Sequence, residues 1–173
     1  MDRTGVKRLA LSALLVTVML MLGYVESLVP TGVPGIKLGL SNSVLLLAVC
    51  WLGIPWAWGL MLVKVLLSAF LFAGVSAMLY SLAGGVLSML VMSVLFRLDF
   101  GLVPIAMAGA VMHNVGQVTL AMLMLKTEKL IYYMAVLMLV GLVTGFVTGT
   151  VTRILIRRIP ESLLPRSGAA RRQ

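Results

Sequence analysis

Acidic residues, histidine and cysteine are scarce in this chain of 173 residues. The sequence contains five aspartates and glutamates in total, one histidine, and one cysteine, Cys50. A single cysteine excludes an internal disulfide, and one histidine cannot build the usual histidine and cysteine metal cluster. Asp2 and Asp99 are the only aspartates, and both lie outside the apolar runs. We therefore expect no catalytic residues, no metal and no cofactor.

Charge is also scarce, and apolar residues take its place. Charged residues make up 11% of the chain, against about 25% in a typical soluble domain. Hydrophobic residues make up 61%, and the mean hydropathy is +1.13. Several apolar runs have the length of about 20 residues that a helix needs to cross a bilayer. The alternating strands of about ten residues that a membrane β-barrel requires are absent. The composition thus indicates an all-α, polytopic membrane protein, with the lipid bilayer as its surroundings.

Proline, glycine and charged residues divide the apolar sequence into six predicted membrane helices. Pro30 to Gly35 and Gly53 to Pro55 are breaks that a helix does not continue through easily. We expect transmembrane helices over residues 9–29, 38–52, 56–72, 76–96, 102–125 and 130–156. The predicted organisation is a transmembrane domain over residues 1–158, followed by a basic cytoplasmic tail over residues 159–173.

The basic residues predict the orientation of these helices. Six spans place both termini on one side, and ten lysines and arginines then fall on that side against three on the other. Cytoplasmic loops carry such an excess, so both termini are expected in the cytoplasm. The ten are Arg3, Lys7, Arg8, Arg97, Arg153, Arg157, Arg158, Arg166, Arg171 and Arg172, and the three are Lys37, Lys126 and Lys129. This distribution also argues against nucleic acid as the reason for the net charge of +9.

Polar residues inside the apolar runs are the candidate binding residues. His113, Asn114 and Gln117 occupy adjoining positions of one helix, and Lys64 lies in the middle of another. Polar groups at membrane depth are costly and usually line a cavity or bind a ligand. The alternatives are hydrogen bonding between helices for the first three, and snorkelling or a backbone carbonyl partner for Lys64. A lined cavity is favoured because three polar residues gather at one place.

The first break between helices holds three further candidates. Glu26 ends the first predicted helix, and Lys37 and Asn42 lie at the start of the second. Backbone N–H groups at a helix start attract anions, and Lys37 would add positive charge there. The alternative is a solvated turn with an ordinary helix cap. The sequence predicts these three residues as substrate-binding residues beside the four in the spans.

Small residues form two stripes with helical spacing. Gly141, Gly145 and Gly149 repeat every four residues, a spacing that lets membrane helices approach closely. A similar stripe contains Ser81, Gly84, Gly85 and Ser88. We expect both stripes to serve helix packing rather than ligand binding.

The polar motifs, taken together, resemble a known family. They are Glu26-Ser27, then Pro34-Gly35-x-Lys37-Leu38-Gly39-Leu40-x-Asn42, then Ser81-Leu82-Ala83-Gly84-Gly85, and His113-Asn114-x-x-Gln117. Over residues 8–158 the chain resembles the Gx transporter family, which is often labelled heptaprenyl diphosphate synthase component I. That family in turn looks like the S components of energy-coupling-factor (ECF) transporters. The resemblance implies a six-helix bundle in the plasma membrane of a bacterium, with a ligand pocket that opens outward.

Two functions follow from the resemblance. The first is a non-enzymatic, substrate-binding transporter subunit for a small solute, which is anionic, isoprenoid or vitamin-like, and its partners would be ATPases and a membrane coupling subunit. The second is a non-catalytic membrane subunit that accompanies a polyprenyl diphosphate synthase or a quinone- or flavin-linked redox system. Prenyl chain elongation needs aspartate-rich motifs, which this chain lacks. The chain could still be an accessory subunit, but a pocket with Lys37, Lys64 and His113 under an outer loop fits solute capture more directly, so the first function is favoured.

Overall fold

The computed structural model describes residues 3–28 and 40–159, and this part of the chain is all helical. Its elements are helix α1 (Arg3–Ser27), a 3₁₀ turn η1 (Leu40–Asn42), α2 (Ser43–Leu52), α3 (Ile54–Ser68), a π-helical segment η2 (Ala69–Ala73), α4 (Gly74–Arg97), α5 (Leu102–Leu125) and α6 (Leu130–Arg158). The predicted boundaries lie within four residues of those of α3, α4, α5 and α6, whereas α1 begins six residues before its predicted start at residue 9. The predicted tail lies outside the described residues beyond Ile159.

Four stretches of the described chain are long and apolar enough to cross a membrane, so the predicted count of six spans is wrong. They are Thr4–Ser27, Ile54–Arg97, Leu102–Leu125 and Leu130–Arg158. The count falls for two reasons. Helix α2 is too short, and α3, η2 and α4 follow one another without an intervening loop.

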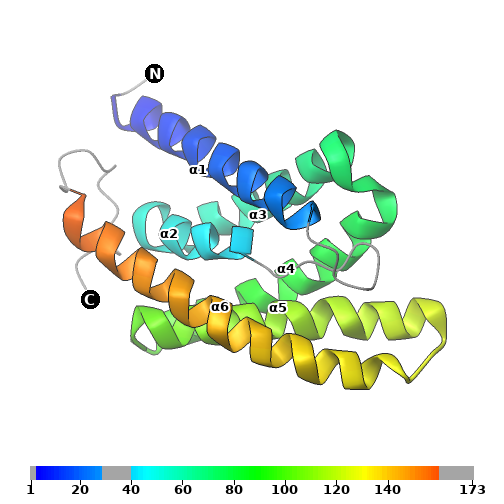
Figure 1. Ribbon diagram of the computed structural model, residues 1–173. Coiled ribbons are helices and arrows are strands. Elements are labelled where there is room, and N and C mark those ends of the chain that lie inside the picture. Colours follow the sequence, from blue (N-terminus) through cyan, green and yellow to red (C-terminus); the bar gives the residue numbers. More distant parts are fainter. Residues whose placement is uncertain (1–2, 29–39, 160–173) are drawn as a thin grey trace.

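Helix α2 is a core helix rather than a span. Its ten residues give a length of about 15 Å, half of the roughly 30 Å of hydrocarbon in a bilayer. Every residue from Val44 to Leu52 is buried, as expected of a helix that is apolar on all sides. In Figure 1, α2 lies between α1 and α6, and it also packs on α3 and α5. The apolar run over residues 38–52 therefore reflects burial within the protein.

The chain turns sharply between α3 and α4. Gly74 has a φ of +76°, in the region that residues with a Cβ rarely adopt. The π-helical segment η2 comes directly before it. Phe72 of η2 packs edge-on against Tyr24 of α1, with 5.6 Å between the ring centroids. The predicted break at Ala73-Gly74 is thus a bend inside one helical stretch of 44 residues.

The outer surface of the bundle is apolar. On α6, Leu139 and Val143 are each 65% exposed, and on α3 and η2 several large apolar side chains also face outward. Soluble monomers rarely expose apolar patches larger than a few hundred Å². A surface of this kind along the long helices is suited to lipid, and it agrees with a multi-pass membrane protein.

Glycines bring α4, α5 and α6 into close contact, as the small-residue stripes predicted. Helices α5 and α6 run side by side in opposite directions (Figure 1). A Cβ added at Gly145 would lie 2.5 Å from the Cα of Met107, and one added at Gly149 would lie 2.9 Å from the Cα of Val103. Gly116 approaches the backbone of Gly84 in the same way. Backbones this close leave no room for larger residues.

Candidate functional site

Four polar side chains connect α1, η1 and α3 inside the bundle. Ser41 donates a hydrogen bond to the Glu26 carboxylate at 3.4 Å. The Lys64 ammonium donates to the side-chain oxygen of Asn42 at 3.0 Å. All four side chains are buried, and Glu26 and Lys64 are only 2% and 6% exposed. The structure therefore brings together Glu26, Asn42 and Lys64, which the sequence had placed in three different segments. Lys37 lies outside the described residues.

The burial of Glu26 and Lys64 has an electrostatic cost. Moving a charged group out of water is unfavourable by several kcal/mol even after the protein relaxes. Hydrogen bonds to charged groups recover only about 1.5–3 kcal/mol each. Charged side chains buried in a membrane protein are functional-site candidates, so Glu26 and Lys64 remain predicted binding residues.

His113 and Gln117 form a second polar group, on the side of α5 that faces α4. The amide nitrogen of Gln117 lies 2.6 Å from Nε2 of His113. The two nitrogens are within hydrogen-bond distance, and the donor or acceptor role of the ring nitrogen depends on the imidazole tautomer. Gly84 of α4 makes room for this pair, since a Cβ there would lie 2.8 Å from both His113 Nδ1 and Gln117 Cγ.

Asn114 points to a different neighbour from that of His113 and Gln117. Its amide donates to the carbonyl oxygen of Leu137 on α6 at 2.7 Å, beside Gly141. Its side-chain oxygen is buried and has no hydrogen-bond partner among the described residues. The polar residues of α5 thus contact both neighbouring helices, and whether they line a ligand cavity stays a prediction.

A small void lies beside Asn42, where residues of α5 and α6 face η1 and α2. It measures about 10 Å³ and is lined by Asn42, Gly109, Ala110 and Thr148, with three apolar neighbours. The Asn42 amide nitrogen is buried without a partner among the described residues. A void needs about 10–15 Å³ to hold one water. This void is therefore at the limit for a single water beside an unsatisfied amide.

Two buried serines, Ser41 and Ser88, lie beside these polar residues and were not among the predicted binding residues. Ser41 bonds to Glu26, and its neighbour Asn42 was the only signal for it. Ser88 is fully buried and its hydroxyl has no partner among the described residues. Its oxygen would lie 3.3 Å from a Cβ added at Gly109, a residue of the void. Ser88 had been noted only as a member of the small-residue stripe.

Replacing Asn114 should test whether its bond to α6 is structural. Asn114→Ala should lower the free energy of unfolding by about 0.6 kcal/mol, the average for polar pairs between membrane helices. Thr150→Val is the control, because the Thr150 hydroxyl bonds only within its own helix, to Phe146. The measurement is equilibrium unfolding in mixed detergent micelles. A cost above about 2 kcal/mol would mean that the residue holds the bundle together and would argue against a binding role.

Long apolar helices with outward-facing apolar side chains, and polar residues buried between them, define a multi-pass helical membrane protein. Its sequence places it more narrowly. The family model for heptaprenyl diphosphate synthase component I matches residues 15–155, and the chain belongs to that family. No curated protein and no solved structure matches the chain.

Proposed function

We propose that this chain is the membrane-embedded, substrate-binding subunit of a transporter, similar to the S component of an ECF transporter. It captures a small solute from the outer side, and ATPases with a membrane coupling subunit drive the solute inward. The solute is anionic, isoprenoid or vitamin-like. Glu26, Lys37, Asn42, Lys64, His113, Asn114 and Gln117 are the proposed binding residues.

One observation carries the proposal, namely the buried bond between Lys64 and Asn42 beside buried Glu26. Glu26 lies near the end of α1, Asn42 lies in η1, and Lys64 lies in α3. A buried cation with amide and hydroxyl neighbours suits a solute that carries oxygen acceptors.

The family description supports a second candidate, a membrane subunit that accompanies a prenyl diphosphate synthase. Such a subunit would not be the catalytic one. The described residues contain no cluster of three or more histidine, cysteine, aspartate or glutamate side chains that could hold a metal ion. The two aspartates of the whole sequence, Asp2 and Asp99, are far apart along the chain. A catalytic role in chain elongation therefore has no support from these residues.

Affinity purification from the native membrane in mild detergent separates the two functions. The transport role predicts that ATPases and a membrane coupling subunit co-purify, and that ATP hydrolysis by the complex drives uptake into vesicles. The accessory role predicts a soluble prenyl synthase and its activity in the same fraction. Recovery of a synthase without ATPases would overturn the transport proposal.

The proposed orientation predicts which turns can be labelled from outside. An even number of spans keeps both termini on one side, and the turn at Gly53 carries no lysine or arginine, so the ten-to-three basic bias holds for four spans as well. With Cys50 replaced by alanine, a cysteine at Glu128 should react with an impermeant maleimide in intact cells. A cysteine at Leu98, at the opposite end of α5, should react only after the cells are opened. The reverse pattern would refute cytoplasmic termini.

A further inference from the structure

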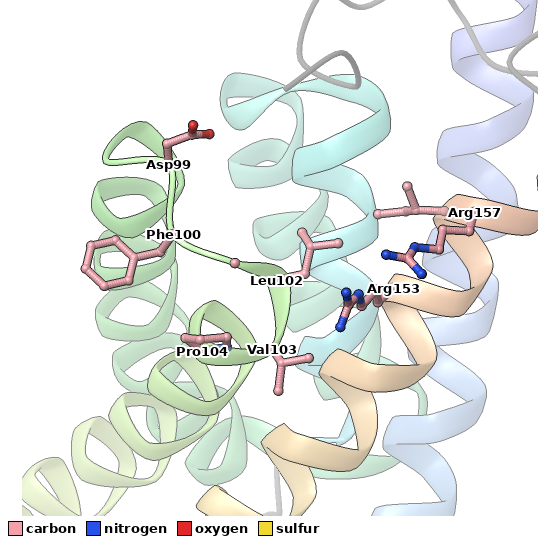
Figure 2. Close-up of a pocket in the computed structure, with 9 residues that line it drawn as sticks. Asp99, Phe100, Leu102, Val103, Pro104, Arg153 and Arg157 are labelled. Atoms are coloured by element: carbon pink, nitrogen blue, oxygen red, sulfur yellow. The ribbon is translucent and has the colours of Figure 1, made fainter. Parts of the chain in front are cut away.

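A second cavity lies at the N-terminal end of α5, and it shares no lining residue with the void at Asn42. It has a volume of about 400 Å³, and its walls are the turn from Asp99 into the first residues of α5 and the last turns of α6. Figure 2 shows Leu102 and Val103 on one side and Arg153 and Arg157 on the other. Cavities of about 300–1,000 Å³ are the usual size for small-molecule sites.

The two arginines give this cavity a positive charge that the described residues do not neutralise. Arg153 and Arg157 are four residues apart on α6 and therefore share one face. Both guanidinium groups extend from α6 toward the start of α5 (Figure 2). Neither has an ion-pair partner in the described part of the chain. Asp99, the one acid on the cavity wall, lies well apart from both guanidiniums in Figure 2.

The remaining walls of the cavity are apolar. Leu102, Val103, Pro104 and Ile156 line it, and beyond its rim Val151 and Ile154 of α6 are about half exposed. The cavity lies at the ends of candidate spans, where α5 begins and α6 ends. A charged group there would meet the headgroup region, and an attached apolar chain could continue along the outer surface of α6.

We propose that this cavity binds an anionic phospholipid of the leaflet at this end of the bundle. Arginine binds phosphate through two parallel N–H···O bonds, and basic pockets between membrane helices bind anionic lipid headgroups. The lipid phosphate lies between Arg153 and Arg157, and one acyl chain follows the apolar surface of α6. The positive end of the α5 dipole adds to the same potential. This site does not depend on the transport role.

Lipid titration followed by native mass spectrometry tests the site in the full-length protein. The probes are dioctanoyl phosphatidylglycerol and dioctanoyl phosphatidylcholine, which differ in net charge. The test variant is Arg153→Gln/Arg157→Gln. The matched control is Arg97→Gln/Arg158→Gln, which removes the same charge from exposed residues that do not line the cavity. Size exclusion and thermal unfolding verify that each protein is folded.

The proposal predicts one saturable phosphatidylglycerol site in the wild type and in the control variant. In the test variant the affinity should fall by about 30-fold, since each basic residue near an anionic lipid contributes about fivefold. Phosphatidylcholine should bind equally weakly to all three proteins. If the test variant does not fold, Arg153→Lys/Arg157→Lys keeps the charge and should still bind the anionic lipid more weakly than the wild type.

Three results would overturn the proposal. Equal losses in the test and control variants would mean that the lipid responds to overall charge. Unchanged binding in the test variant would show that the two arginines take no part in lipid binding. The same conclusion follows from unchanged binding in the lysine variant, if only that variant folds. Inorganic phosphate that displaces the short-chain lipid at equal concentration would point to a free phosphate ligand instead of a lipid.

Discussion

Gly145→Ala should cost about 2 kcal/mol of unfolding free energy, although alanine is the better helix former. The new Cβ would lie 2.5 Å from the Cα of Met107 and 2.9 Å from the carbonyl oxygen of Ala106. Both are backbone atoms, so no side chain can rotate away, and α5 and α6 must separate. Overpacking of this kind costs about 1–3 kcal/mol. The measurement is equilibrium unfolding in mixed detergent micelles.

Gly59→Ala is the matched control for this prediction. Gly59 lies within α3, and a Cβ added there would have no heavy atom within 4 Å. The same substitution should therefore be neutral or should stabilise the protein by up to about 1 kcal/mol through helix propensity. Equal tolerance of the two substitutions would show that α5 and α6 are not packed as closely as described.

Lys64→Met should leave the protein folded and greatly weaken its binding of the solute. The substitution removes the desolvation cost of a buried charge but leaves the Asn42 oxygen without its donor, which costs about 1–3 kcal/mol, so the midpoint of thermal unfolding should stay close to that of the wild type. Solute affinity should fall by at least about 30-fold, the lower end of the cost of truncating a buried, hydrogen-bonded charge in a complex. The measurement is the amount of co-purified solute per protein, beside thermal unfolding.

Lys129→Met serves as the control for Lys64→Met, because Lys129 is exposed and its replacement removes the same charge. This variant should retain the solute at the wild-type level. If Lys64→Met also retained it, Lys64 would be a tolerated buried lysine and would have no part in binding.

The sequence was sufficient for the helices and their packing but not for the number of spans. Hydropathy reports that a segment avoids water, and it cannot distinguish lipid from the protein interior. Residues 44–52 are apolar because α1, α3, α5 and α6 surround them. Length was the available signal, since ten residues are too few to cross a bilayer. The glycine repeat on α6 was readable because its spacing has one main use between membrane helices.

The site could be predicted as a set of residues but not as a set of contacts. Burial of Lys64 and His113 followed from their place in apolar runs. The partner of Lys64 could not be predicted in this way. Asn42 contacts Lys64 because η1 leads into α2, and α2 packs on α3. Likewise, His113 and Asn114 are adjacent in sequence and point to different helices, which depends on where α4 and α6 pack on α5.

The central claim is that the buried polar residues hold a small solute, and the mass spectrum of the wild-type protein tests it most directly. The protein is purified from native membranes in mild detergent and sprayed intact. We expect a species heavier than the bare chain by the mass of one small molecule, which is released on collisional activation and then identified. Bare protein alone, or a species that carries only lipid, would contradict the claim.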